Sequence, residues 1–571
     1  MTATDTRDKK HGFRAALSYP DFRWLVIGLS VSSIGSWAYN VALYVYVYEQ
    51  TQSAGWAAAT TLGRFVPALL FGSYGGVIAE RIERRRLLIS LDLISMTVMI
   101  VLGILTGADV LALFAIMLAA ITSMIGTIYY PATAAMTPQV VDESDLAGAN
   151  AFESLVENVS VIAGPALGAG VLAVSSVEVA LFFNAATFLF SAWCSSQIET
   201  RSAASDVTEG GSAGVLKQVA TGFKTILSSS TAAILVGASV LASFFYGTDT
   251  VLFVVYSEER LGIGPDGFGL LLAGLGVGGI IMSPFVDKLA GSPKLARIIS
   301  LGLIVYTLPT ALLLVIDVPA FAFGIQIIRG AGTLVVDVLA VTALQRSLPS
   351  DMIARVFGVF MTLVLAAISL GAFVTAPLLG AAGLDTTLLV YSVGVSVLVI
   401  VAYPRTRLVD REMTQRLAAL APRIKALEGL GIFASASRTA LERLAAAAEE
   451  VTLPAGDRII QEGDPADFFY VTTDGTVSVS AVGELGQEQH LRTMGPREYF
   501  GEIGLLEQGP RTASVDATTD VTLLKIPGDD FVSALTETAA TSAFMEGARM
   551  RLARTHPSRD LTATALESPE V

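Results

Sequence analysis

The chain has 571 residues, of which 53% are hydrophobic and only 15% are charged, with a formal net charge of −14 at pH 7. Soluble domains average about 25% charged residues, so this composition excludes a chain that is water-soluble throughout. Residues 410–571 hold 25 acidic and 15 basic residues, a net charge of −10. An acidic region argues against nucleic acid as a partner, because phosphate binding depends on Lys and Arg.

Apolar runs long enough to cross a membrane dominate the chain before residue 404. A helix needs about 20 apolar residues to span the hydrocarbon core. We predict twelve spans, six on each side of a polar break. They lie near residues 22–48, 56–79, 87–106, 109–135, 150–175, 177–198, 231–256, 265–290, 297–316, 318–343, 356–381 and 385–403.

Basic residues in the connecting segments predict the orientation. Lys and Arg occur before the first span and after the even-numbered spans, whereas the opposite loops carry only Arg260. Basic loops stay in the cytosol, so we expect a multi-pass protein of the inner or plasma membrane with both termini cytosolic. The predicted parts are a cytosolic N-terminus (1–20), a first half (21–198), a central loop (199–230) and a second half (231–404).

The two halves have related sequences. Glu80-Arg81 after the second span matches Asp287-Lys288 after the eighth, an offset of 207 residues. Duplicated six-helix halves are a transporter architecture, with the substrate site near the midplane between them. We therefore expect a small-molecule substrate and the lipid membrane as partners.

The loop between the second and third spans carries a specific motif. Residues 76–86, Gly-Val-Ile-Ala-Glu-Arg-Ile-Glu-Arg-Arg-Arg, resemble the loop signature of the major facilitator superfamily, G-x-x-x-D-R-x-G-R-R, with Glu80 in place of Asp and Glu83 in place of the second Gly. The resemblance implies a tight turn held by an ion pair; the alternative is a basic anchor on the cytosolic side. The motif residues are Gly76, Glu80, Arg81, Arg84 and Arg85.

Two further runs resemble the enterobactin-exporter and macrolide-efflux branch of that superfamily. They are residues 19–25, Tyr-Pro-Asp-Phe-Arg-Trp-Leu, followed by Gly35-Ser36-Trp37, and residues 164–170, Gly-Pro-Ala-Leu-Gly-Ala-Gly. Glycine lets helices approach closely and proline bends one of them, which a purely structural bundle also uses. The resemblance favours export over import.

Charged side chains inside a membrane are costly and mark function by default. Glu153 and Glu157 are four residues apart and share a helix face. Glu157 is our first candidate for a proton-coupling carboxylate, with Arg64 or Arg329 as its counter-charge; the alternative is structural ion pairing between helices. The full set of transport candidates is Glu157, Arg329, Arg64, Glu153, Asp249 and Asp337.

The acidic C-terminal part changes to the period of strands. Residues 405–429 are a predicted helical connector, and short strand-like runs then follow at about ten-residue spacing, which predicts a small jelly-roll-like β-roll with flanking helices. Runs on either side of Asp474-Gly475 predict a hairpin.

Residues 500–515, Phe-Gly-Glu-Ile-Gly-Leu-Leu-Glu-Gln-Gly-Pro-Arg-Thr-Ala-Ser-Val, closely resemble the phosphate-binding cassette of cyclic-nucleotide-binding domains. The resemblance covers residues 430–545 and leaves 546–571 as a C-terminal helix and tail. It implies cAMP or cGMP as a regulatory ligand, with Arg511 and the N–H groups of a short helix on the phosphate and Glu502 on the ribose. The alternative is a roll that no longer binds nucleotide. The implied contacts are Gly501, Glu502, Ile503, Gly504, Arg511, Thr512 and Ala513.

Together these patterns predict a polytopic α-helical membrane protein fused to a cytosolic cyclic-nucleotide-binding domain. The leading hypothesis is a secondary active exporter of a small molecule, regulated by cyclic nucleotide. The alternatives are a membrane-bound cyclic-nucleotide receptor and a lipid flippase. We expect no enzyme, cofactor or metal site, because the three His are scattered and no P-loop occurs. The substrate, the coupling ion and the oligomeric state stay open.

Overall fold

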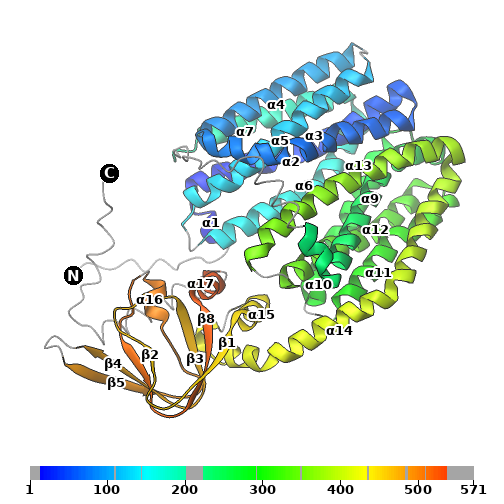
Figure 1. Ribbon diagram of the computed structural model, residues 1–571. Coiled ribbons are helices and arrows are strands. Elements are labelled where there is room, and N and C mark those ends of the chain that lie inside the picture. The colour runs from blue at the N-terminus through cyan, green and yellow to red at the C-terminus, as the bar shows by residue number, and fades with distance from the viewer. Residues whose placement is uncertain are drawn as a thin grey trace. The chain divides into compact units, whose positions relative to one another are not determined.

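The computed structural model describes residues 13–108, 111–142, 145–200, 223–290, 292, 294–347, 350–433, 436, 438–482, 487–507 and 509–536. The chain forms two compact units, Met1–Glu412 and Met413–Val571. The first is helical and the second holds all the described strands (Figure 1). The predicted C-terminal helix and tail, residues 546–571, lie outside the described residues.

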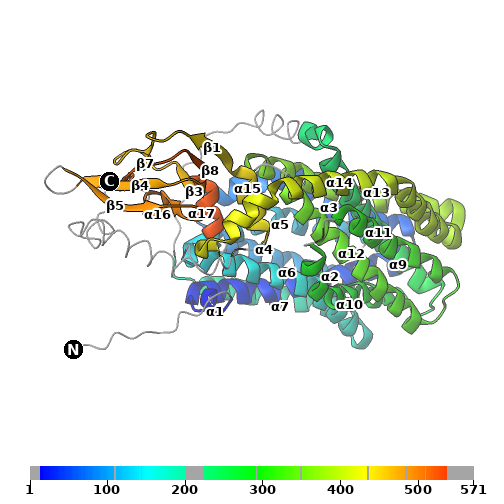
Figure 2. The same ribbon diagram turned by 90° about the horizontal axis from the view of Figure 1, so that it is seen from below.

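Long helices make up the first unit (Figures 1 and 2). In the first half they are α1 (Phe13–Ala16), α2 (Pro20–Thr51), α3 (Ala54–Arg81), α4 (Arg84–Gly107), α5 (Ala112–Val140), α6 (Leu146–Val174) and α7 (Val177–Ser196). In the second half they are α9 (Ser230–Glu259), α10 (Gly267–Ala290), α11 (Leu295–Thr307), η2 (Leu308–Leu314), α12 (Pro319–Ser347), α13 (Ser350–Leu389), η3 (Val390–Gly394) and α14 (Val395–Glu428), whose residues after Glu412 belong to the second unit.

Ten helical segments of the described chain are long and apolar enough to cross a membrane. The last runs from Val356 to Arg407 and contains Gly383 in a non-helical conformation (φ 76°, ψ 174°), where one helix ends and another begins. The protein is thus a multi-pass helical membrane protein, and the number of twelve spans remains a prediction.

The two halves use the same helix packing. In the first half α2 packs on α6 and α3 on α5; in the second, α9 packs on α13 and α10 on α12. Gly164 of α6 lies against Trp37 of α2, and Gly371 of α13 lies against Phe244 of α9. Both residues of the second pair follow those of the first by 207 positions, the same offset as between Glu80 and Asp287. Small residues here let the helix backbones approach closely.

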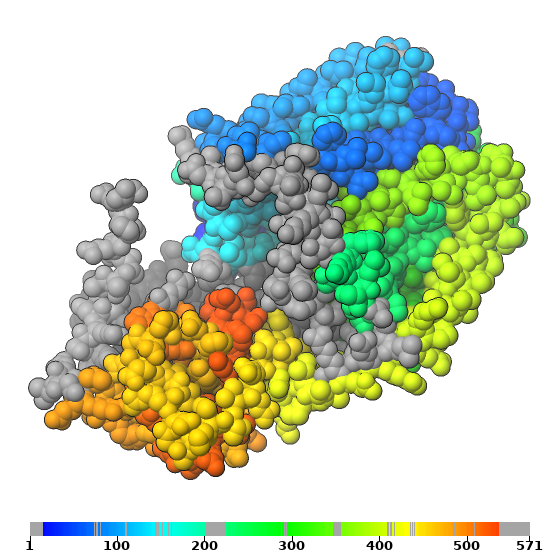
Figure 3. Space-filling view, viewed as in Figure 1, coloured from blue at the N-terminus to red at the C-terminus, as the bar shows by residue number. Residues whose placement is uncertain are grey.

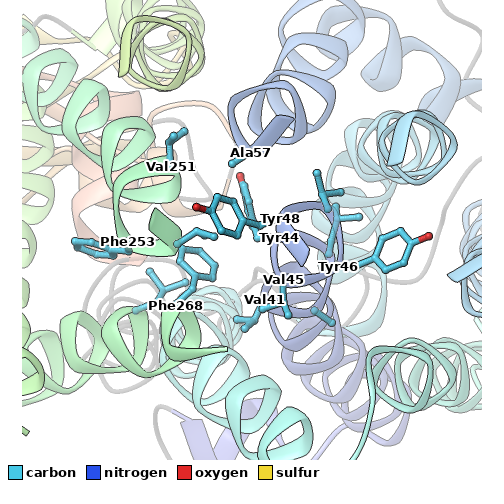
Figure 4. Close-up of a cluster of buried hydrophobic side chains, with 14 of the residues drawn as sticks. Val41, Tyr44, Val45, Tyr46, Tyr48, Ala57, Val251, Phe253 and Phe268 are labelled. Carbon is cyan, nitrogen blue, oxygen red and sulfur yellow. The ribbon is translucent and has the colours of Figure 1, made fainter. Parts of the chain in front are cut away.

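The halves share one hydrophobic core at the end of the bundle that carries the α2–α3 and α9–α10 loops. Side chains of α2, among them Tyr44, join Phe253 of α9 and Phe268 of α10 in one cluster (Figure 4). The Tyr44 hydroxyl is 2.8 Å from Oγ1 of Thr61, which is 2.9 Å from Oγ1 of Thr250 in the second half. The halves also meet where α3 packs on α13 and α6 on α10.

At the opposite end each half has a core of its own. One described cluster contains Phe22, Leu88 and Ile198 of the first half, and another contains Val236 and Phe360 of the second. In Figure 3 blue spheres of the first half adjoin yellow-green spheres of the second half at the right of the view. The described halves are therefore packed together at one end and separately at the other.

The second unit is a two-sheet roll with flanking helices. Its sheets have strand orders β1-β8-β3-β6 and β2-β7-β4-β5, all pairs antiparallel. The elements are η4 (Gly431–Phe433), α15 (Arg438–Ala447), β1 (Glu449–Leu453), β2 (Arg458–Ile460), β3 (Phe468–Asp474), β4 (Val477–Val482), β5 (Glu488–Met494), β6 (Tyr499–Phe500), α16 (Glu502–Leu506), β7 (Ser514–Ala517), β8 (Val521–Pro527) and α17 (Gly528–Thr536).

The hairpin predicted at Asp474-Gly475 is wrong. The turn is present, with Gly475 at φ 80°, but β3 pairs with β6 and β8 while β4 pairs with β5 and β7. Inward-facing side chains of both strands have to enter one core, so the turn passes from one sheet to the other instead of closing a ladder.

Candidate functional site

The cassette of the C-terminal unit is built around a glycine that the backbone requires. Gly501 lies between β6 and α16 with φ 85°, a conformation that glycine adopts without steric cost. A Cβ at this position would lie 2.8 Å from Nη1 of Arg511. The tight turn therefore brings the start of α16 against the Arg511 side chain.

Arg511 is buried, with 5% of its surface exposed. Its Nη1 donates to the carbonyl of Gly501 and its Nη2 to the carbonyl of Phe468, both at 2.8 Å. Burial lowers its pKa, and the neighbouring acidic groups of Asp467 and Glu502 oppose that shift. The guanidinium stays charged, because the pKa of arginine is too high for it to lose its proton in a protein.

The other predicted contacts surround this arginine. Glu502 is the first residue of α16 and is 4% exposed. Gly504 is buried in α16, and its carbonyl accepts from the N–H of Gly509 at 3.0 Å. Thr512 and Ala513 follow Arg511 and lead into β7; like Ile503 they are half-buried. A buried cation beside the start of a helix is suited to bind a phosphate anion.

The first half of the membrane unit contains a cavity of about 440 Å³. Side chains of α2, α3, α4, α5 and α7 line it, together with Leu365 of α13. Aromatic rings and hydroxyl groups predominate, and no Asp or Glu of the described chain is among the lining residues. The cavity wall includes Trp37, Arg64, Tyr129 and Tyr130.

Arg64 supplies the charge of this cavity. Its guanidinium carbon lies 5.2 Å from the ring centre of Phe65 and 5.9 Å from that of Tyr44. No acidic side chain of the described residues forms an ion pair with it. Of the transport candidates, Arg64 is the one that lines the cavity.

In the second half, Arg329 and Asp249 form a buried ion pair. Arg329 is 0% and Asp249 2% exposed, and Nη2 donates to both carboxylate oxygens at 2.8 Å. Gln326 accepts from Nη1 at 2.7 Å, the carbonyl of Tyr306 accepts from Nε at 2.9 Å, and the Tyr306 hydroxyl donates to Asp249 at 2.8 Å. Arg329 is thus the ion-pair partner of Asp249, and the expectation that it is the counter-charge of Glu157 is wrong.

The remaining predicted carboxylates do not join that network. Glu153 accepts a hydrogen bond from Thr137. Glu157 is half-buried and lies within hydrogen-bond reach of Trp37 in the cavity wall. Asp337 is exposed on α12. Glu157 therefore neighbours the cavity, while Glu153 and Asp337 do not line it.

Asp92 of α4, which is 1% exposed, was not among the predicted site residues. Neither of its carboxylate oxygens has a hydrogen-bond partner within the described structure. Ser191 of α7 approaches the carboxylate without meeting the geometry of a hydrogen bond, and Tyr129 of α5 is a further polar neighbour. Asp92 lies inside the predicted span 87–106. The criterion that selected the six transport candidates, an ionisable side chain within a membrane span, therefore applies to Asp92 as well. Tyr306 and Gln326 carried no comparable signal, because neither is charged.

The loop motif lies at the junction of α3, which ends at Arg81, and α4, which begins at Arg84. Arg85 Nη2 donates to the carbonyl of Ser196 at the end of α7, at 2.6 Å. Glu83 forms an ion pair with Arg86, 3.2 Å from its Nε. The surroundings of Gly76 and the side chain of Glu80 are not described by the structure, so the ion pair expected of Glu80 stays a prediction.

Fold and sites together define a helical membrane transporter that carries a cyclic-nucleotide-binding domain. A family model described as transmembrane secretion effector matches residues 12–425, and one described as cyclic nucleotide-binding domain matches residues 450–538. The chain belongs to the transmembrane secretion effector family of the major facilitator superfamily. The predicted family and its efflux branch are thereby confirmed.

Individual relatives match one part of the chain at a time. A CRP-like cAMP-activated global transcriptional regulator of Mycobacterium tuberculosis is 32% identical over 99 residues, 17% of this chain and 44% of that protein. Macrolide efflux protein A of Streptococcus pyogenes is 32% identical over 143 residues, 25% of this chain and 35% of that protein. The chain thus spans less than half the length of these relatives. A cyclic nucleotide-binding-like protein of Brucella abortus is a similar solved structure (TM-score 0.18, 30% identity, 20% of this chain and 97% of that one).

Proposed function

We propose that the chain is a secondary active exporter of a small molecule, regulated by cAMP or cGMP on its cytosolic C-terminal domain. The observation that carries the regulation is the buried Arg511, which lies beside Gly501 and Glu502 in the same chain as a transporter body. Export is supported by the similarity to an efflux protein. The proposal places both termini in the cytosol and assigns no enzymatic reaction.

The contacts of Arg511 supply a route by which nucleotide acts on the rest of its domain. A phosphate at Arg511 competes with the carbonyl of Phe468, the first residue of β3. The next residue, Phe469, stacks on Phe531 of α17 with ring centres 4.1 Å apart and an interplanar angle of 16°. The N–H of Gly528, where α17 begins, donates to the carbonyl of Asp467 at 2.8 Å. Binding is therefore expected to shift α17.

Transport would use the exchange between states open to opposite sides that duplicated halves support. The shared core at one end and the separate cores at the other correspond to one of those states, closed at the end of the α2–α3 loop. Glu157, beside Trp37, stays our candidate for proton coupling. Replacing it by Gln should abolish the dependence of export on the proton gradient.

The test is a calorimetric titration of cAMP and cGMP into the purified full-length protein in lipid nanodiscs. We expect micromolar or tighter binding of one nucleotide and its loss, by about a hundredfold or more, in Arg511→Ala, because two charge-assisted hydrogen bonds disappear. Arg458→Ala is the matched control, since Arg458 is an exposed arginine of the same roll, paired with Asp516. If neither nucleotide binds the folded protein, the proposed regulation is wrong.

Export is tested separately in inside-out vesicles. Movement of a solute that changes with nucleotide supports the regulated exporter. Nucleotide binding without movement of any solute supports the receptor, and translocation of a fluorescent lipid supports the flippase.

A further inference from the structure

The cavity of the first half holds a positive charge, Arg64, with which no acidic side chain of the described residues forms an ion pair. Arg64 lies eleven residues into the 28-residue helix α3, far from both ends of that helix. Its guanidinium lies over the rings of Tyr44 and Phe65, which attract a cation but do not neutralise it. An ionised side chain within a membrane span is costly unless it is paired or solvated. Arg329 shows that this fold can pair an arginine fully when no ligand is needed.

The surroundings of Arg64 are suited to an aromatic or otherwise apolar body. Trp37, Phe65 and Tyr130 face the cavity, together with the hydroxyl groups of Ser32 and Ser36. Its volume of about 440 Å³ falls in the range of small-molecule sites. Such sites bind through apolar walls and a few polar groups that fix the orientation of the ligand.

Nearby carboxyl groups do not cancel the charge. Glu157 of α6 is within reach of Trp37, yet it is in none of the ion pairs of the described residues. Asp92 of α4 is buried behind the wall, next to Tyr129, and is not a lining residue. The polar surface that a ligand meets is therefore hydroxyl, amide and guanidinium.

We propose that this cavity binds an amphipathic organic anion, with its carboxylate or sulfonate on Arg64 and its apolar rings against Trp37, Phe65 and Tyr130. A guanidinium holds such groups through two parallel hydrogen bonds. Stacking on the aromatic walls supplies the apolar part of the affinity. That the bound anion is a transported substrate rests on the proposed function, but its binding can be measured without transport.

Two xanthene dyes of opposite charge test it. Fluorescein is an anion and rhodamine 123 a cation on nearly the same ring system. Their binding to the full-length protein in nanodiscs is measured by equilibrium dialysis, with empty nanodiscs subtracted. Arg64→Gln removes the charge, Arg64→Lys keeps it without the planar fork, and Arg23→Gln, an exposed arginine of α2, is the control.

We expect fluorescein to bind more tightly than rhodamine 123. Arg64→Gln should weaken the affinity for fluorescein by about tenfold or more, because one charge-assisted contact is lost. Arg64→Lys should weaken it by less. If Arg64→Gln does not fold, the wild-type protein still decides: indole-3-acetate should displace fluorescein and tryptamine, the matching amine, should not.

Equal binding of both dyes, tighter binding of rhodamine 123, unchanged fluorescein affinity in Arg64→Gln, or no binding of either dye would each overturn the proposal. Binding of fluorescein that depends on Arg64, without export of the dye, would overturn the exporter and leave the anion site standing. Export of fluorescein that is unaffected in Arg64→Gln would overturn the anion site and leave the exporter standing.

Discussion

The two halves of the membrane unit share their packing but differ at the positions equivalent to one buried ion pair. The second half buries Arg329 and Asp249 as a fully bonded pair. The residues 207 positions earlier are Thr122 and Ala42, both uncharged, and Thr122 lines the cavity of the first half. At these positions the second half holds an ion-pair network, whereas the first half has two uncharged residues, one of them in the wall of its cavity.

The comparison separates two uses of charge in a membrane. Breaking a buried pair leaves one uncompensated ion, so a complete pair is a structural element once it exists. An unpaired group such as Arg64 or Asp92 has no such structural partner to lose. The charge of Arg64, which lines the cavity, is then available to a ligand.

The largest expected effect is that of Arg329→Ala. It leaves the Asp249 carboxylate buried without its cation, which costs about 3–5 kcal/mol of stability. The thermal unfolding midpoint of the purified protein measures the loss. The double variant Arg329→Met with Asp249→Leu should recover most of it, because no charge stays buried. A single variant as stable as the wild type would contradict a structural role for the pair.

A smaller loss of stability is expected from substituting the two equivalent glycines that let helices pack closely in each half. Gly164→Ala and Gly371→Ala place a Cβ against Trp37 and against the Phe244 backbone, and overpacking of this kind costs about 1–3 kcal/mol. Gly170→Ala is the control, since a Cβ there meets no atom within 4 Å. Loss of stability in only one of the two variants, by the same midpoint measurement, would break the equivalence of the halves.

Removal of one hydrogen bond from the network around Arg329 and Asp249 should lower the free energy of unfolding by a smaller amount still. Tyr306→Phe deletes the hydroxyl that donates to Asp249, which is worth about 1.5 kcal/mol for a bond to a charged group. The carboxylate keeps both contacts to Arg329, so folding should persist. A midpoint identical to that of the wild type would show that the hydroxyl does not stabilise the pair.

The smallest effect is predicted for Asp92→Asn. Because neither oxygen of Asp92 has a hydrogen-bond partner in the described structure, the change should alter stability by less than about 1 kcal/mol. Asp249→Asn is the matched comparison and should lose far more. A loss at Asp92 as large as that at Asp249 would show that Asp92 is a structural partner, and the contrast between the halves would fail.

Much of this architecture could be predicted from the amino-acid sequence. Spans follow from apolar length, the halves from the 207-residue offset, and the nucleotide-binding cassette from the spacing of Gly501, Glu502 and Arg511. Each is a local pattern, so neighbouring residues suffice to show it. The expected hairpin failed at Gly475, because a local turn signal does not say in which sheet the next strand pairs.

The partners of buried charges could not be predicted in the same way. The acid that pairs with Arg329 is 80 residues away on another helix, and only the packing of α9, α11 and α12 brings Asp249 and Tyr306 to it. The sequence by itself determined the class of protein, its duplicated body and its nucleotide-binding domain, since those depend on composition and short motifs. Tertiary structure alone decided which charges are neutralised and which face a cavity, because pairing over a few ångströms depends on how distant helices pack.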